Sequence, residues 1–207
     1  HVESVLLGWN NAAAFVHISP EMGARFWHYT AVLEPGAISA PPDKGVQRLI
    51  YVTEGQVELE TRGSQTLSVG NFAYLPPNVP HTIRATNSSR LVVFEKRYGP
   101  LDGVAIPELV VGHERDAPGE PFQGDPDARL QTLLPVEPAF DMAVNVFTYQ
   151  PGATLPQVEI HIMEHGLIML DGAGVYRLGD RWYPVQAGDV IWMASYCPQW
   201  FVAMGKS

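Results

Sequence analysis

The chain has 207 residues, of which 46% are hydrophobic and 17% are charged, and its net charge is −9. This composition supports a folded core and excludes a largely disordered chain. The 13 Lys and Arg residues are scattered, which argues against nucleic acid or a membrane surface as the main partner. No apolar run approaches the roughly 18 residues of a spanning helix. The single cysteine, Cys197, excludes an internal disulfide and a multi-thiolate zinc site.

Short apolar runs separated by turn signals predict an all-β protein. Glycine (19) and proline (18) interrupt runs that are rich in Val, Ile, Leu, Tyr and Phe. In chain order, the expected strands cover residues 48–53, 56–61, 72–75, 91–95, 166–170, 175–178 and 190–193. Strands of this length with regular turns favour a sandwich or a barrel. No long segment has a helical apolar period, although we expect a short helix over 127–134.

The sequence repeats itself. Residues Glu54-Gly55 match Asp171-Gly172 at an offset of 117 (from 54 to 171), and Pro80-His81 match Pro198-Gln199 at an offset of 118 (from 80 to 198). So steady an offset predicts two copies of one β unit. We expect an N-terminal barrel over 1–111, an irregular linker rich in Pro, Gly and charge over 112–126, and a C-terminal barrel over 127–207.

The run 158–166, VEIHIMEHG, predicts a metal site. Glu159, His161 and His165 are two and four residues apart, and side chains alternate along a strand, so all three would share one face. Burying them together without a metal would leave polar groups unpaired. Oxygen and nitrogen donors without thiolate favour Mn, Fe, Ni or Zn. Gln199 is the expected fourth ligand, and its amide oxygen with Glu159 favours Mn(II). Alternatively, Gln199 bonds only the barrel rim.

The first copy lacks this ligand set. A shift of 117 places Pro42, Lys44 and Arg48 at the positions of Glu159, His161 and His165, and His81 stands opposite Gln199. We therefore expect the N-terminal barrel to be metal-free, with a structural or interfacial role. His81 is then either the relic of a lost site or part of a small-anion site with Arg48 and Lys44.

The spacing of Gly152, Glu159, His161, His165 and Gly172, with Gln199 downstream, resembles the motifs of the cupin superfamily. The usual order of ligands is His-x-His, Glu and a last His, whereas this chain has Glu, His, His and Gln. The resemblance implies a bicupin: two tandem jelly-roll-like β-barrels, with a metal held inside the second.

The segment GVYRLGDRWYPVQAGDVIW (174–192), with EIHIMEHG and CPQW, closely resembles the (S)-ureidoglycine aminohydrolase family, and the likeness extends over nearly the whole chain. It implies Mn(II) bound by Glu159, His161, His165 and Gln199, and hydrolysis of (S)-ureidoglycine to (S)-ureidoglycolate and ammonia in purine catabolism. It also implies a substrate-pocket role for Tyr176, a further Tyr and Lys beyond residue 207, and a homo-oligomer such as an octamer. The compartment would be the endoplasmic reticulum for a plant member and the cytoplasm for a bacterial one.

Two other classes remain open from the residues. A metal-dependent cupin dioxygenase or isomerase would use the same ligands with Fe(II), and a binding or storage bicupin would not catalyse a reaction. If the protein is this hydrolase, Glu159 either carries a proton as well as binding the metal, or is a ligand only. In the second case Tyr176 or one of the expected residues beyond 207 moves protons. Tyr176 could also be an aromatic residue of the barrel wall.

Overall fold

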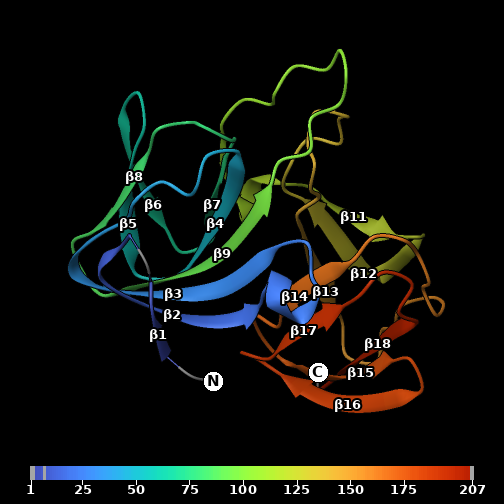
Figure 1. Ribbon diagram of the computed structural model, residues 1–207. Helices are drawn as coiled ribbons and strands as arrows, with labels where there is room; N and C mark the ends of the chain where they lie inside the picture. Colours follow the sequence, from blue (N-terminus) through green and yellow to red (C-terminus); the bar gives the residue numbers. More distant parts are fainter. Residues whose placement is uncertain (1–2, 7, 206–207) are drawn as a thin grey trace. The chain divides into compact units, whose positions relative to one another are not determined.

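The computed structural model describes residues 3–6 and 8–205, and the regular secondary structure of this part of the chain is almost entirely β-strand (Figure 1). Its helical segments are two 3-10 turns, η1 (Pro20–Met22) and η2 (Glu114–Asp116). Within the described residues, no helix is both long and apolar enough to span a membrane. The chain divides into two compact units: unit 1 comprises residues 1–117 and 133–144, and unit 2 comprises 118–132 and 145–207.

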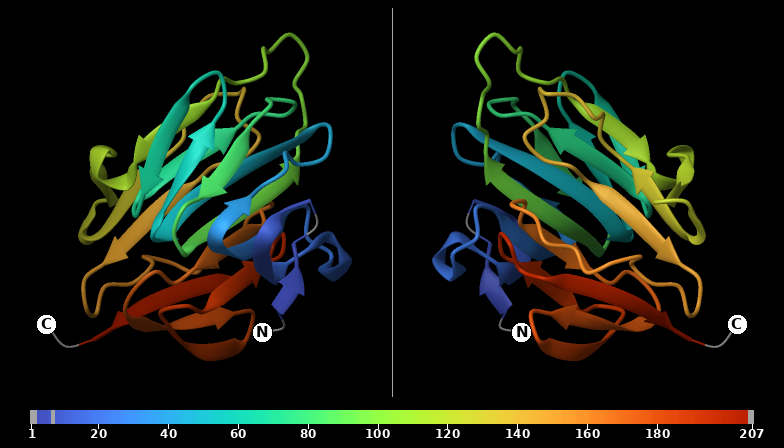
Figure 2. Two further views of the ribbon diagram at one scale, coloured as in Figure 1. Left: turned by 90° about the vertical axis from the view of Figure 1, so that its left-hand side faces the viewer. Right: turned by 90° about the vertical axis from the view of Figure 1, so that its right-hand side faces the viewer.

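Unit 1 is one curled antiparallel sheet. Its ten strands are β1 (Glu3–Val5), β2 (Asn10–Ile18), β3 (Trp27–Ile38), β4 (Val46–Glu54), β5 (Gln56–Glu60), β6 (Ser64–Ser68), β7 (Asn71–Leu75), β8 (Thr82–Ala85), β9 (Ser89–Arg97) and β10 (Val110–His113). The main strand order is β10-β7-β4-β9-β3-β8-β5-β6, and β2 pairs with both β3 and β1. The two side views of Figure 2 show how the sheet curls.

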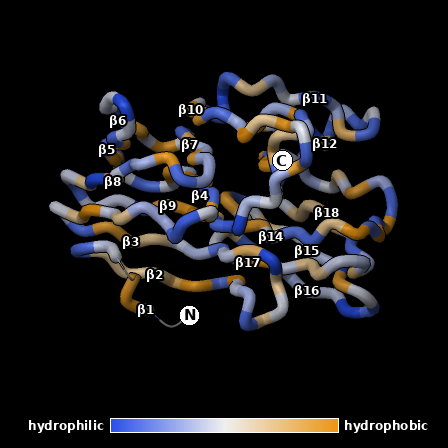
Figure 3. The backbone as a smooth tube through the Cα atoms, turned by 45° about the horizontal axis from the view of Figure 1, so that its top comes forward, coloured by the Kyte–Doolittle hydropathy of each residue, from blue (hydrophilic) through white to orange (hydrophobic). Residues whose placement is uncertain are grey.

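Side chains alternate between the two faces of the sheet in unit 1, so one face is apolar and lines the core. In β3, Tyr29, Ala31 and Leu33 point into an apolar core. Ile50 and Val52 of β4 do the same, together with side chains from β5, β7, β8 and β9. The hairpin between β5 and β6 is hydrophilic at its tip (Figure 3). Because one face of the sheet is buried, the strand register is specified, and the register determines which side chains point into the barrel.

Unit 2 has three smaller sheets. Its strands are β11 (Gly119–Phe122), β12 (Asp125–Thr132), β13 (Asn145–Tyr149), β14 (His165–Ile168), β15 (Ala173–Leu178), β16 (Arg181–Gln186), β17 (Val190–Met193) and β18 (Gln199–Met204). They pair in the orders β11-β12-β13, β14-β17 and β16-β15-β18. The core of the unit consists of seven buried side chains: Leu155, Tyr176, Val185, Ile191, Met193, Phe201 and Ala203.

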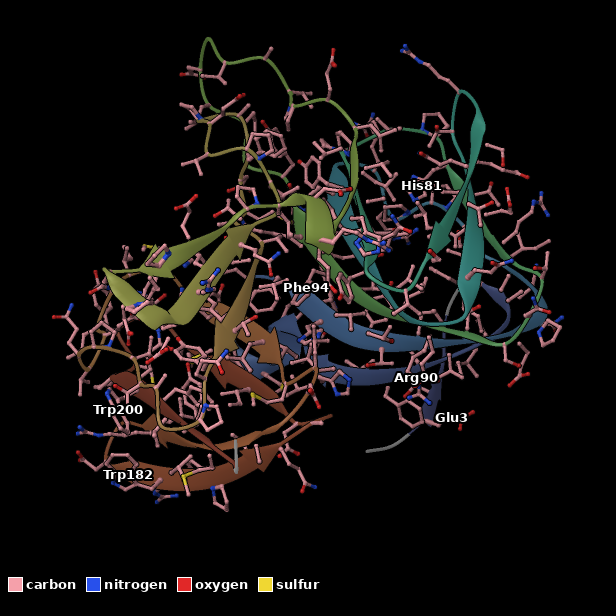
Figure 4. All side chains as sticks on the ribbon, turned by 180° about the vertical axis from the view of Figure 1, so that it is seen from behind. Glu3, His81, Arg90, Phe94, Trp182 and Trp200 are labelled. Atoms are coloured by element: carbon pink, nitrogen blue, oxygen red, sulfur yellow. The ribbon has the colours of Figure 1, made fainter. Side chains whose placement is uncertain are left out.

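The sheet β16-β15-β18 has aromatic side chains on its other face. Arg177 of β15 is the cross-strand partner of both Trp182 and Trp200. Its guanidinium lies 5.7 Å from the centre of the Trp182 ring, and the two indoles meet edge to face with their centroids 5.7 Å apart. Figure 4 labels both tryptophans. The neighbouring residue Tyr176 therefore points to the opposite, inner face of the sheet.

The predicted repeat is present in the strand registers. Arg48 pairs with Leu75 between β4 and β7, and His165 pairs with Met193 between β14 and β17. The offsets are 117 (48 to 165) and 118 (75 to 193). Sheet order repeats as well, since β8-β5-β6 corresponds to β18-β15-β16. The extra residue of the second copy lies in the turn between β15 and β16, where Gly179 and Asp180 separate the paired residues Leu178 and Arg181.

The predicted helix over 127–134 is wrong, because these residues belong largely to β12. Ala128 and Leu130 alternate with polar residues, and β12 pairs on both sides, with β11 and β13. The predicted linker 112–126 also contains regular structure, including the end of β10, the turn η2 and strand β11. Residues 133–144 belong to unit 1, so the chain passes between the units three times rather than once.

Candidate metal centre

The ligands predicted for the metal meet in unit 2, although not on one continuous strand. Glu159 forms an isolated antiparallel bridge with Gln199, with Glu159 N donating to Gln199 O at 2.9 Å and Gln199 N donating to Glu159 O at 3.0 Å. The segment around His161 is irregular, and the His161 carbonyl accepts a bond from the Tyr196 backbone N–H at 2.7 Å. Strand β14 begins at His165. The bridge and this loop contact thus bring the side chains together.

Three polar groups of these residues are in mutual contact. Gln199 Nε2 lies 3.1 Å from His161 Nε2 and 3.4 Å from Glu159 Oε2, and the Glu159 Oε2 to His161 Nε2 distance is 4.0 Å. Protein ligands bind divalent metals at about 2.0–2.6 Å, so neighbouring donor atoms of one metal lie roughly 3–4 Å apart. The separations among these three groups fit that spacing.

The two histidines lie side by side, and one ring nitrogen of His161 faces the other polar groups. The rings of His161 and His165 lie 4.6 Å apart between centroids and are tilted by 34°. His161 Nδ1 is 3.0 Å from the Met163 carbonyl, which assigns the proton to Nδ1 and leaves the lone pair of Nε2 toward Gln199. Desolvation of the His165 ring, with His161 beside it, lowers the pKa of His165, although the residue as a whole is exposed to solvent. A neutral imidazole is the form that binds a metal.

Tyr176 and Met193 complete the buried side of the cluster. The Tyr176 hydroxyl donates to Gln199 Oε1 at 2.9 Å and also lies 3.2 Å from Met193 Sδ. All three side chains are buried, with exposed fractions of 5%, 2% and 2% for Tyr176, Gln199 and Met193. Burial raises the pKa of Tyr176, as do the nearby Tyr149 and Glu159, so its phenol is protonated at neutral pH. Tyr176 is thus a hydrogen-bond donor and acceptor rather than a base.

Sequence reasoning missed Met193 and Tyr149. Met193 is the cross-strand partner of His165, and the alternation of β17 turns it inward. Tyr149 ends β13 and packs edge to face on Phe201. Desolvation and the nearby carboxylates of Glu159 and Asp125 raise its pKa. The apolar alternation around both residues was visible in the sequence, but their pairing partners were not.

The donor set suits a hard divalent metal, while the cluster is not fully assembled. Among residues 3–6 and 8–205, no three His, Cys, Asp or Glu side chains together form a ready metal-binding group. The third polar group beside Glu159 and His161 is the carboxamide of Gln199, which points its nitrogen at them. Carboxylate, imidazole and amide oxygen are ligands of Mn(II)-type ions. The residues present fit such an ion once the amide oxygen faces it.

The corresponding place in unit 1 is occupied by an arginine. Arg48, at the register position of His165, is 2% exposed. It donates from Nε to Glu95 Oε1 at 2.6 Å and from Nη1 to the Ala40 carbonyl at 3.0 Å, and Nη1 also lies 2.9 Å from Nε2 of His81, a residue labelled in Figure 4. Desolvation lowers the pKa of His81 to about 4, with a further contribution from Arg48. Lys44 is exposed, and a guanidinium already paired with Glu95 gives no support to an anion site.

These two units share one repeated strand order, and the second has a cluster of polar side chains, so the fold defines the protein as a bicupin. The family model of the Cupin domain matches residues 29–95 and 145–207. The solved structure of protein Ylba from E. coli superposes with a TM-score of 0.88 at 29% identity, over 98% of this chain and 83% of that one.

Curated relatives identify the family within the bicupins to which the chain belongs. The (S)-ureidoglycine aminohydrolase of Arabidopsis thaliana is 43% identical over 214 residues, which cover all of this chain and 70% of that protein. The (S)-ureidoglycine aminohydrolase of Escherichia coli K12 is 31% identical over 99% of this chain and 80% of its own length. The chain belongs to the (S)-ureidoglycine aminohydrolase family, a family of enzymes.

Proposed function

We propose that this protein hydrolyses (S)-ureidoglycine to (S)-ureidoglycolate and ammonia, as a step of purine catabolism, at one Mn(II) site in unit 2. The identity of 43% over the whole chain supports the substrate, because both units and the segment with the proposed ligands are included. The contacts among Glu159, His161 and Gln199 support the position of the site. We propose His165 as the fourth ligand, because its ring lies beside that of His161, with the two centroids 4.6 Å apart.

The reaction replaces an amino group by a hydroxyl on the carbon between a carboxylate and a ureido nitrogen. The C–N bond breaks, the leaving amine takes up a proton, and a hydroxyl from water is added to the same carbon. A hard cation with open coordination positions would supply polarisation and a fixed orientation of the substrate. The residues of the chain must then deliver the proton to the leaving nitrogen and hold the substrate carbon within reach of water.

Glu159 is the group best placed to carry that proton. Its Oε2 is the only carboxylate oxygen for which the described residues show contacts with both His161 and Gln199. Its side chain is 18% exposed, so it is accessible from solvent as well as facing the site. Tyr176 is buried and already bonded to Gln199. We therefore assign proton transfer to Glu159 and a supporting role to Tyr176.

The test is ammonia release from freshly prepared (S)-ureidoglycine by metal-stripped protein, with and without added Mn(II). We expect release only with the metal. Absence of release at saturating Mn(II) would overturn the proposed activity, and oxygen consumption with Fe(II) would favour the dioxygenase alternative. Light scattering on the same sample measures the homo-oligomer that we propose from the family likeness.

The role of Glu159 requires a separate comparison. We expect Glu159→Gln to lower kcat by about 10²–10⁴-fold, the usual contribution of a general acid or base. Asp180→Asn, which changes a fully exposed carboxylate of the same unit, should leave turnover unchanged. Near-full turnover of metal-loaded Glu159→Gln would show that Glu159 is a ligand only.

A further inference from the structure

The carboxamide of Gln199 directs its nitrogen, and not its oxygen, toward Glu159 and His161. Its nitrogen lies 3.1 Å from His161 Nε2 and 3.4 Å from Glu159 Oε2, while its oxygen accepts the Tyr176 hydroxyl at 2.9 Å. This orientation is consistent chemically, because an amide N–H₂ donates to the carboxylate and to the lone pair of the imidazole. The –NH₂ group therefore contacts both side chains.

An amide nitrogen cannot act as the ligand. Its lone pair is delocalised into the carbonyl, so the amide acts on a metal through its oxygen. For Gln199 to bind the ion together with Glu159 and His161, its Oε1 and Nε2 must exchange places by a half-turn of the terminal torsion. After the exchange the nitrogen faces Tyr176, and it needs an acceptor there, because Gln199 is 2% exposed.

Tyr176 can form a hydrogen bond with the Gln199 carboxamide in either of its two orientations. A phenol has one proton to donate and lone pairs to accept with. In the orientation seen here, the proton goes to Gln199 Oε1. In the exchanged orientation, the phenol oxygen accepts from Gln199 Nε2, and its proton turns to Met193 Sδ, which already lies 3.2 Å away. A thioether is a weak acceptor, but it suffices to keep the buried proton from being left without a partner.

We propose that Tyr176 is a positioning residue which, with Met193 as the alternative acceptor of its proton, allows the Gln199 carboxamide to exchange its ends when the metal binds. The inference rests on the proposed metal site and adds a role for residues that do not touch the ion. Without the phenol oxygen, the exchanged nitrogen would be buried with no acceptor, and an unpaired buried donor is unfavourable. Loss of such outer partners typically weakens metal binding 10–100-fold.

The experiment is a titration of metal-stripped protein with Mn(II) alone, followed by calorimetry and by the electron paramagnetic resonance of the free ion. We expect Tyr176→Phe to weaken Mn(II) binding 10–100-fold and Met193→Leu to weaken it by a smaller factor. The matched control is Tyr183→Phe, which removes a hydroxyl from the cross-strand partner of Tyr176, an exposed residue. It should bind Mn(II) as tightly as the unsubstituted protein.

A double-mutant cycle separates positioning from packing. In the Gln199→Ala background no carboxamide remains to be oriented, so Tyr176→Phe should change Mn(II) affinity by less than about threefold. Equal losses in both backgrounds, or unchanged affinity of Tyr176→Phe in the otherwise unsubstituted chain, would overturn the inference. If Tyr176→Phe does not fold, unchanged affinity of Met193→Leu overturns the proposed proton acceptor. Absence of Mn(II) binding by the unsubstituted protein would instead overturn the metal site itself.

Discussion

Substitution of the buried Arg48 tests whether its ion pair with Glu95 stabilises unit 1. Arg48 and Glu95 form an ion pair of 2.6 Å whose side chains are 3% and 17% exposed, and Tyr29 also donates to the same Glu95 oxygen at 3.0 Å. Truncation of one partner leaves the other charge buried without compensation, which typically costs about 3–5 kcal/mol. We expect Arg48→Met to destabilise the protein by that amount. For a chain of this size, the melting temperature should fall by about 6–20 °C.

Differential scanning calorimetry measures the effect, and an exposed pair provides the control. Arg84 and Glu60 lie 2.8 Å apart, but their side chains are 45% and 44% exposed. Arg84→Met should therefore cost about 0–1 kcal/mol. The double variant Arg48→Met/Glu95→Leu should regain most of the loss, because replacing both buried partners by apolar groups is often close to neutral. A loss of less than about 1 kcal/mol for Arg48→Met would refute the argument.

Further predictions concern a turn shared by the two copies and the response to acid. Gly55 and Gly172 both have positive φ (+72° and +75°), but a Cβ at Gly55 would lie 2.5 Å from the Ser88 carbonyl, whereas at Gly172 it would meet nothing within 4 Å. Gly172→Ala should thus lower the free energy of unfolding by about 1–2 kcal/mol, and Gly55→Ala should lower it clearly more. Urea denaturation measures both values, and equal losses would contradict the steric argument. Burial lowers the pKa of His28 to about 3 and that of His81 to about 4, from 6.5. The unfolded chain binds more protons below pH 6.5, so stability should fall from pH 6.5 toward pH 4, by about 1.4 kcal/mol per pH unit for each group. The slope of unfolding free energy against pH should be smaller for His28→Phe, and an unchanged slope would exclude His28 as a source.

The repeat and the strands were predictable because alternation and turn signals are local. The offsets 117 and 118 in the sequence correspond to the paired residues of β4 with β7 and of β14 with β17. Strand β12 was missed because Asp125, Pro126 and Asp127 resemble the start of a helix, while the pairing with β11 and β13 decides the conformation. Tertiary pairing overrides local preference in such segments.

The candidate site was predictable as a set of residues but not as a geometry. Even spacing predicted that Glu159, His161 and His165 share one face of a strand, whereas the bridge of Glu159 to Gln199 and the Tyr196 contact hold this segment without a strand. The bond from Tyr176 to Gln199 joins diagonal neighbours on β15 and β18, which depends on the register. The pairing of Arg48 with Glu95 likewise depends on β4 lying beside β9.

The one-residue difference between the copies shows where this architecture accepts extra chain. The added residue lies at the tip of the β15–β16 hairpin, where the second copy has one more strand pair, Leu178–Arg181, beyond the pairs Ala173–Gln186 to Arg177–Trp182 that correspond to those of β5 and β6. A residue added at the tip does not slide one strand along the other, so the shared pairs keep their inward and outward order. This hairpin is therefore a natural attachment point for a fluorophore or an affinity peptide.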